Sequence, residues 1–252
     1  MIIVTIFGLI FGSFFNCAAM RIARGEDFIH GRSHCRSCGH VLGASDLVPL
    51  ISWIISKGRC RYCGQKISIR YPVSELLFSV LAAAIYLKYG FSAEAVRDWI
   101  MTGCLFTLSI VDLESYIIPD GCLIIGFLAW IFTAPFLKMS ILDVSYDILA
   151  GLLCGGIMLG ISLALDRLLH MNSLGGGDIK LFALMGLYLG FLGSYFLILG
   201  SSILGLVFVA VRHLLHRDKS SAAIPFGPSI ALAGYIMMLF GDDITQWYIS
   251  LL

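Results

Sequence analysis

Long apolar runs dominate this chain and limit what it can fold into. Of its 252 residues, 59% are hydrophobic and 13% are charged, whereas soluble domains carry about 25% charged residues. A soluble domain of this size cannot bury so much apolar surface, because its exterior needs polar side chains that face water. The net charge of +1 also argues against a nucleic-acid partner, which would require a concentrated basic face. We therefore expect the lipid bilayer to be the solvent of this chain.

The apolar runs predict an all-α polytopic membrane protein with about eight transmembrane helices. A helix needs about 20 mostly apolar residues to cross a bilayer. The candidate segments lie at approximately 1–20, 73–89, 99–114, 118–137, 147–166, 179–194, 195–215 and 225–243. The first segment has no Lys or Arg ahead of its apolar run, so we expect it to be retained rather than cleaved as a signal peptide. The boundary between the sixth and seventh segments depends only on Gly193 and Ser194.

The positions of the positive charges predict the orientation of the chain. Cytoplasmic loops of membrane proteins carry an excess of Lys and Arg. With the N-terminus outside and each segment crossing in turn, fourteen of the 17 Lys and Arg residues face the cytoplasm. The residues that fall outside are Lys88, Arg97 and Lys138. The sequence thus predicts a first transmembrane helix at 1–20, a cytoplasmic loop at 21–72 and a helix bundle at 73–252.

The predicted cytoplasmic loop contains two CxxC pairs with 21 residues between them. The four cysteines are Cys35, Cys38, Cys60 and Cys63. Two such turns can place four thiolates tetrahedrally around zinc, and Gly39 and Gly64 follow the pairs where the turns need positive φ. Two disulfides or a redox pair are alternative interpretations, which the reducing cytoplasm weakens. We expect a structural zinc ion, because four protein ligands leave no open position for catalysis.

Two aspartates lie at the ends of apolar segments. Asp112 ends the third segment and Asp178 begins the sixth, so the predicted topology places both at the cytoplasmic edge of the bilayer. Ionisable residues in such positions are costly and often functional, and two close carboxylates can share one proton and activate a water molecule. Three glycines before Asp178 would let an extended substrate approach. From these residues alone, ordinary helix-end acids are an equally good interpretation, with Glu114 and Asp120 as competing acids.

Six motifs between positions 12 and 228 resemble, in order, those of the bacterial type IV prepilin peptidases. These leader peptidase/N-methyltransferases belong to the GxGD class of intramembrane aspartyl proteases. Residues 12–16 are similar to the family's GSFxN motif, and the CxxC pairs are similar to its cytoplasmic zinc-binding loop. The other four motifs are RYPxxE at 70–75, the acidic segment at 112–120, GGGDIK at 175–180 and PFGP at 225–228.

The resemblance implies an aspartic-type endopeptidase with Asp112 and Asp178 as its catalytic dyad. It implies cleavage of the basic leader of type IV prepilins or pseudopilins at the cytoplasmic face of the bacterial inner membrane. It also implies N-methylation of the new N-terminus with S-adenosylmethionine and a structural zinc ion on the four cysteines. Beside the resemblance, we predict Gly175, Gly176, Gly177 and Lys180 as substrate-binding residues.

The resemblance further associates Gly58 and Glu75 with methyl transfer. Each residue also has a structural interpretation, Gly58 as a turn residue and Glu75 as a polar group inside the helix bundle. We find no glycine-rich dinucleotide-binding pattern that would hold the methyl donor. A donor site would therefore have to be formed by the cytoplasmic loop and the spans.

Three other readings lead to different expectations. A small transporter with a proton relay would need acids near the bilayer midplane and an inverted repeat, and the sequence presents neither. A zinc-loop scaffold for a secretion machine would explain the cysteines but not two aspartates at matching depth. A catalytic metal hydroxide would require that loss of Cys35 or Cys60 abolish the chemical step even in a folded protein.

Overall fold

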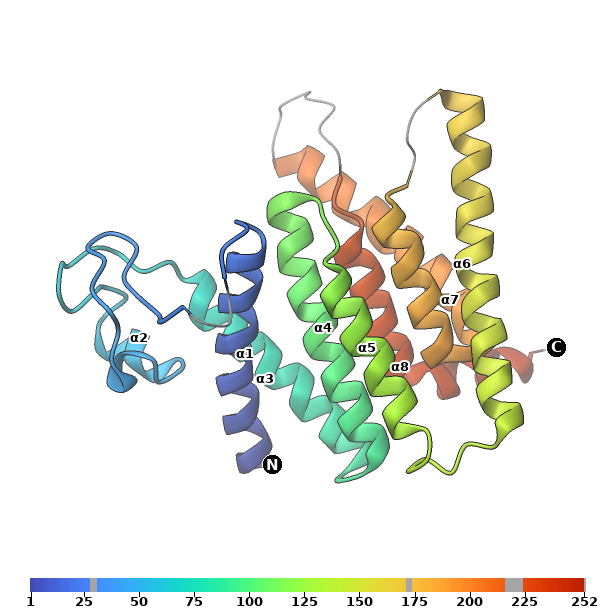
Figure 1. Ribbon diagram of the computed structural model, residues 1–252, viewed down its shortest axis with the longest axis horizontal. Helices are drawn as coiled ribbons and strands as arrows, with labels where there is room; N and C mark the ends of the chain where they lie inside the picture. The colour runs from blue at the N-terminus through green and yellow to red at the C-terminus, as the bar shows by residue number, and fades with distance from the viewer. Residues whose placement is uncertain (28–30, 171–173, 216–223, 252) are drawn as a thin grey trace. The chain divides into compact units, whose positions relative to one another are not determined.

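In the part of the chain that the structure describes, all regular secondary structure is helical. The computed structural model describes residues 1–27, 31–170, 174–215 and 224–251, and Figure 1 shows helices joined by loops. Within those ranges, extended pairing is limited to two isolated bridges. The chain divides into two compact units, residues 1–90 and 91–252. The prediction of an all-α fold is therefore confirmed.

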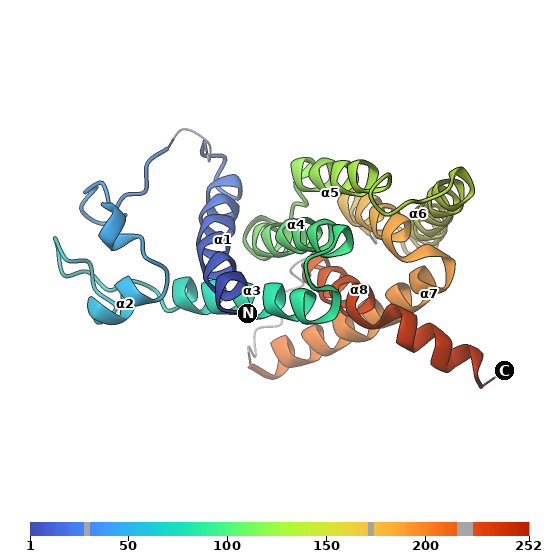
Figure 2. The same ribbon diagram turned by 90° about the horizontal axis from the view of Figure 1, so that it is seen from below.

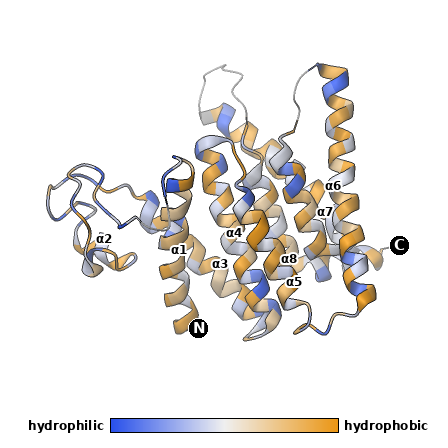
Figure 3. Cartoon of the chain, in the orientation of Figure 1, coloured by the Kyte–Doolittle hydropathy of each residue, from blue (hydrophilic) through white to orange (hydrophobic). Residues whose placement is uncertain are grey.

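Four helices among the described residues are long and apolar enough to cross a membrane. They are α1 (Ile2–Ile22), α3 (Arg70–Tyr89), α6 (Ile141–Leu169) and α7 (Gly176–Leu215). Figure 3 shows the apolar residues along these helices. The shorter α5 (Asp120–Thr133) is also apolar, whereas α4 (Ala93–Ser115) carries four acids and α8 (Gly227–Ile249) carries two. A membrane protein is thus supported, but the predicted count of eight spans is not confirmed.

Helix α7 is interrupted at Gly190. This residue has φ 64° and ψ −168°, a conformation that glycine reaches without the steric penalty of a side chain. The parts of α7 on either side of it cover the two segments predicted at 179–194 and 195–215. The sequence placed their boundary at Gly193 and Ser194, because no local pattern distinguishes which nearby glycine adopts positive φ. The break therefore exists, but at a different residue.

The first unit pairs α1 with α3 and places the cysteine loop between them in sequence. The Ser79 hydroxyl of α3 donates a hydrogen bond to the Thr5 carbonyl of α1 at 2.9 Å. The rings of Phe15 and Phe78 meet edge to face with their centroids 4.9 Å apart. Within the loop lie a short helical turn, η1 (Ala44–Asp46), and α2 (Ile51–Ile55). Polar and aromatic contacts thus join the two long helices on which the loop is mounted.

The second unit is arranged around α7, which packs against α5, α6 and α8. Helix α4 packs against α5 and α8, as the two views in Figures 1 and 2 also show. Side chains from four helices are fully buried in this core, among them Met101, Leu108, Trp130, Phe182, Met185 and Ile230. This packing brings the end of α4 to the start of α8.

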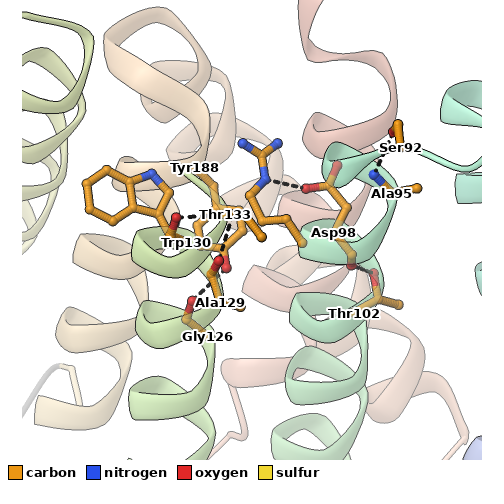
Figure 4. A network of polar contacts seen from close by, with 10 residues as sticks. Ser92, Ala95, Asp98, Thr102, Gly126, Ala129, Trp130, Thr133 and Tyr188 are labelled. Carbon is orange, nitrogen blue, oxygen red and sulfur yellow. Dashed lines mark hydrogen bonds and ion pairs between the residues drawn. The ribbon is translucent and has the colours of Figure 1, made fainter. Parts of the chain in front are cut away.

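A polar cluster, composed of Arg97, Asp98, Gly126 and Tyr188, joins three of these helices, and Figure 4 shows Asp98, Gly126 and Tyr188 within it. The Arg97 guanidinium contacts the Asp98 carboxylate at 2.8 Å and lies 5.4 Å from the centre of the Tyr188 ring. The Tyr188 hydroxyl donates to the Gly126 carbonyl at 2.6 Å. The cluster therefore ties α4, α5 and α7 together near the start of α4, whereas Asp112 lies near its end.

Candidate active site

Asp112 lies in the last turn of α4 and is buried, with 5% of its surface exposed. Its Oδ2 atom accepts a hydrogen bond of 2.8 Å from the backbone N–H of Gly227. Gly227 is the first residue of α8, where backbone N–H groups have no partner within the helix and favour an anionic acceptor. The start of α8 thus orients the Asp112 carboxylate and favours its charged form.

Gly227 belongs to the PFGP motif, to which the sequence assigned no role. A Cβ atom at this position would lie 2.8 Å from Asp112 Oδ2, closer than real Cβ contacts. Glycine therefore permits the close approach of the α8 backbone to the carboxylate. The motif was visible in the sequence, but no local signal pointed from it to Asp112.

Asp178 lies in the first turn of α7 and is half-buried. Its backbone N–H donates to the Gly175 carbonyl at 3.1 Å, which closes the turn that the glycines form. A Cβ atom on Gly177 would lie 2.9 Å from the Cβ atom of Ile118. By contrast, a Cβ atom on Gly176 would meet no atom within 4 Å. The backbone thus packs tightly at Gly177 and faces open space at Gly176.

The structure brings the two acidic segments together. The close approach of Gly177 to Ile118 joins the start of α7 to the loop after α4. Lys180 forms an ion pair with Asp120 at 2.7 Å, with both side chains largely exposed. Asp112 and Asp178 therefore belong to segments that contact each other. Two carboxylates in such a setting can share one proton and divide the roles of acid and base between them.

The competing acids differ from Asp112 in their surroundings. Asp120 forms an ion pair with Lys180. Lys180, which we predicted to bind substrate, therefore has a partner within the chain. Glu114 is exposed near the end of α4. Asp112 is therefore the buried acid of its segment.

Four cysteines form a second cluster, in the first unit. The sulfur atoms of Cys35, Cys38, Cys60 and Cys63 lie within 4.8 Å of one another and could hold a metal ion. The two pairs have matching turns: the N–H of Gly39 donates to the Cys35 carbonyl at 2.8 Å, and the N–H of Gly64 to the Cys60 carbonyl at 2.9 Å. Both glycines have φ 72°. The predicted metal-ligand residues thus converge.

The electrostatics of these thiols fit a cation at their centre. Backbone hydrogen bonds at Cys38 and Ser37 lower the pKa of Cys35 to about 6. A backbone bond at Gln65 lowers the pKa of Cys63, but desolvation and the neighbouring sulfurs outweigh it and raise that pKa to about 11. Without a cation the four sulfurs cannot all ionise, because like charges at this range repel. A set of four thiolates is the donor set of a closed zinc site.

The two residues associated with methyl transfer also lie in the first unit. Glu75 is buried on α3, and its Oε2 atom accepts a 2.7 Å hydrogen bond from the Leu50 N–H. Gly58 has φ 66°, and a Cβ atom there would lie 2.9 Å from the Trp53 ring. Both structural interpretations, a polar group in the bundle and a turn residue, therefore agree with these contacts.

Comparisons with known proteins cover nearly the whole chain. Residues 6–89 match the family model of the bacterial Peptidase A24 N-terminal domain, and residues 99–210 match that of the type IV leader peptidase family. A prepilin leader peptidase/N-methyltransferase of Bacillus subtilis is 34% identical over 255 residues, covering 99% of this chain and 98% of that protein. No solved structure gives a significant match.

Relatives from other bacteria carry the same name. The protein of Aeromonas salmonicida is 34% identical over 223 residues, covering 87% of this chain and 75% of its own. That of Legionella pneumophila is 33% identical over 226 residues, covering 87% and 76% respectively.

Proposed function

The chain belongs to the type IV leader peptidase family, and from this premise we propose that it cleaves the basic leader from type IV prepilin or pseudopilin precursors and then methylates the new N-terminus. The relatives named as prepilin leader peptidase/N-methyltransferase support both activities. The match extends over both units of the chain. The assignment thus does not depend on a single motif.

We propose that Asp112 and Asp178 perform the peptidase reaction as an aspartyl dyad. The ionised carboxylate takes a proton from water, and the protonated carboxyl polarises the scissile carbonyl, without a covalent acyl-enzyme. The observation that carries this proposal is the contact between the two segments that hold these aspartates. Gly177 packs closely against Ile118, and Lys180 forms an ion pair with Asp120. The hydrogen bond from Gly227 to Asp112 favours that carboxylate as the ionised base.

The glycines before Asp178 are candidates to receive the substrate backbone. Open space beside Gly176 supports this role, because an extended peptide can approach a chain that lacks a side chain. The packing of Gly177 and the ion pair of Lys180 support a structural contribution as well. Gly175, Gly176, Gly177 and Lys180 therefore stay predictions for substrate binding.

Two bound groups accompany the proposed activities. A structural zinc ion on the four cysteines would hold the loop between α1 and α3, with no open position for chemistry. S-adenosylmethionine would supply a methyl group to the uncharged N-terminal amine, while the donor sulfur keeps the electrons of the broken C–S bond and the amine loses a proton to solvent. The cluster of four sulfurs supports the first group, and the name of the relatives supports the second.

We further propose a bacterial inner-membrane location with the N-terminus outside and the dyad at the cytoplasmic face. The distribution of Lys and Arg supports this orientation, although Arg217 and Lys219, which the prediction placed in the cytoplasm, lie outside the described residues. The proposed parts are a first span at 1–20, a cytoplasmic zinc loop at 21–72 and a helix bundle at 73–252. In this arrangement the dyad faces the side on which a basic leader remains.

Product analysis by mass spectrometry tests both activities. Purified protein in detergent micelles is incubated with a prepilin, with and without S-adenosylmethionine. We expect the leader to be removed in both samples and the new N-terminus to be methylated only when the methyl donor is present. An intact prepilin would contradict the peptidase assignment, whereas a cleaved but unmethylated product would contradict only the methyltransferase assignment.

A further inference from the structure

Helix α2 turns its apolar side outward. That side consists of three isoleucines at the helical spacing i, i+3 and i+4, with 55%, 59% and 65% of their surfaces exposed: Ile51, Ile54 and Ile55. On the opposite side, Ser52 and Trp53 line a cavity of about 630 Å³ within the first unit. A short helix in water would show the reverse arrangement, so the isoleucines mark a surface that suits an apolar neighbour.

The chain enters α2 through a strained turn at Leu50. This residue has φ 61° and ψ −51°, and the Ile51 N–H donates to the Pro49 carbonyl at 2.6 Å. Such a three-residue turn is rare and costly for a residue that carries a side chain. The Leu50 N–H donates to Oε2 of Glu75 on α3 at 2.7 Å, which holds the turn in place. The outward direction of the isoleucines is therefore fixed by the backbone and by α3.

The hydrogen bond to Glu75 also fixes the level of α2 along the two long helices of the first unit. Glu75 follows Arg70, the first residue of α3, and a rise of 1.5 Å per residue places it about 8 Å inside that helix. The Ser13 side chain of α1 bonds to the same carboxyl group, and Figure 1 shows α2 alongside α1 and not beyond its end. Because a headgroup layer is about 5–8 Å thick, α2 lies at the level of the membrane interface.

The residues that follow α2 also suit contact with lipid. Ile69, which precedes α3, and Val73 within it are exposed, so the apolar surface continues along the chain into a helix long enough to span the membrane. Lys57 and Arg59, which come directly after α2, are exposed as well. Basic side chains beside an apolar face pair with lipid phosphates and are typical of helices that lie in the membrane interface. A soluble protein partner would have to displace headgroups to reach the same face.

We propose that α2 is an interfacial membrane helix, which lies in the leaflet where α1 ends and α3 begins. Its isoleucines contact the acyl chains nearest the headgroups, and Lys57 and Arg59 lie among the phosphates. The cysteine loop is then held on the bilayer at a third point, in addition to its connections to α1 and α3. Lipid contact on one side of α2 supports the cavity wall that Ser52 and Trp53 form on the other. The inference depends on α1 and α3 crossing the membrane and on neither of the proposed activities.

Photocrosslinking in a bilayer identifies what covers this face. The photoreactive residue p-benzoylphenylalanine replaces Ile55 in the full chain, which is reconstituted in vesicles of phosphatidylcholine and phosphatidylglycerol and irradiated. Mass spectrometry of the peptides then shows which molecule was captured. The same replacement at Val80, an exposed residue of α3, is the positive control, and at Val41, an exposed residue of the first cysteine turn, it is the matched control. We expect lipid adducts at positions 55 and 80, with at least about tenfold more at 55 than at 41.

Substitutions on the same face test whether the isoleucines cause the contact. Ile51→Asp/Ile54→Asp, combined with the photoreactive residue at position 55, places two carboxylates where the acyl chains would lie. Because charge is costly there, lipid capture at position 55 should fall by about tenfold, while capture at position 80 stays unchanged. Ile51→Leu/Ile54→Leu keeps the face apolar and should retain the adduct. Zinc content and prepilin cleavage, measured on every variant, identify any that fail to fold.

The captured molecule decides between the possible neighbours of α2. Lipid at position 55 that is lost in Ile51→Asp/Ile54→Asp would establish the interfacial helix. Capture of a second copy of the chain, or of another segment of the same chain, would assign the face to protein contact and overturn the inference. Lipid at position 80 without lipid at position 55 would show that α2 lies outside the bilayer. Absence of lipid at both positions would also contradict the membrane-spanning role of α3, but neither proposed activity.

Discussion

At the scale of single residues, the contact between Gly227 and Asp112 joins positions that are 115 apart in sequence. The sequence identified Asp112 because an acid at the end of an apolar segment is unusual. Gly227 lies in a recognisable sequence motif, but the residue that this motif contacts depends on how α8 packs against α4. Residue types and local spacing could therefore predict the candidate catalytic aspartates. They could not predict the hydrogen bond from Gly227 that orients Asp112.

We predict that Gly227→Ala lowers the rate of prepilin cleavage by roughly tenfold or more, because misplacing a reacting group by about 1 Å can cost about 100-fold in rate. The added Cβ would lie 2.8 Å from Asp112 Oδ2 and push the carboxylate from its position. The measurement is kcat for cleavage in detergent micelles. Gly160→Ala is the matched control, since a Cβ there meets no atom within 4 Å. Wild-type kcat in Gly227→Ala would show that this contact does not orient the reacting carboxylate.

At the scale of elements, hydrophobic runs located the helices well but not the number of spans. Helices α1, α3 and α6 cover segments that the sequence placed at 1–20, 73–89 and 147–166. The acids of α4 and α8 reduce the apolar character on which span prediction depends. The sequence predicted the break in α7 at Gly193 and Ser194 instead of at Gly190. Several glycines occur in this region, and the backbone conformation at each depends on tertiary packing.

The polar cluster at the start of α4 leads to a prediction about stability. We expect Arg97→Leu to destabilise the protein by about 3–5 kcal/mol, because it leaves the buried Asp98 carboxylate without its cation. Asp98 has 1% of its side chain exposed and Arg97 has 17%. Thermal unfolding in detergent measures the effect. The double variant Arg97→Leu/Asp98→Leu should recover much of the loss, and equal stability of wild type and Arg97→Leu would contradict the role given to the pair.

The cysteine loop leads to a prediction about metal and pH. We expect one zinc ion per chain and a loss of zinc affinity as the pH is lowered, because the ligands must be deprotonated. In the metal-free loop Cys35 is ionised above about pH 6, whereas Cys63 keeps its proton up to about pH 11. Zinc binding at pH 7 should therefore release protons. Calorimetry in buffers of different ionisation enthalpy measures this release, and its absence would contradict a four-thiolate site.

Substitution of a ligand separates a structural metal from a catalytic one. Cys60→Ser should lower zinc content and the stability of the loop, because structural zinc contributes directly to folding. Protein that remains folded should still cleave prepilin, since we assign the chemistry to the aspartates. Folded Cys60→Ser protein that has lost the chemical step would instead support a catalytic metal hydroxide.

At the scale of the whole molecule, the sequence predicted which segments carry chemistry but not how they meet. The two acidic segments are joined by Gly177 with Ile118 and by Lys180 with Asp120. These contacts arise because α7 packs against α5 and α8, and α4 against the same two helices. Likewise, the cavity in the first unit depends on the folded loop between α1 and α3. Such long-range arrangements leave no periodic pattern in the sequence.

The most direct test of the aspartyl dyad is prepilin cleavage in membranes by wild type, Asp112→Asn and Asp178→Asn at matched expression. General acid–base catalysis contributes about 10²–10⁴-fold to rate, so we predict a loss of at least about 100-fold in both variants. Glu114→Gln, which changes an exposed acid of the same segment, should stay within a few-fold of wild type. Cleavage at the wild-type rate by either Asp112→Asn or Asp178→Asn would contradict the dyad.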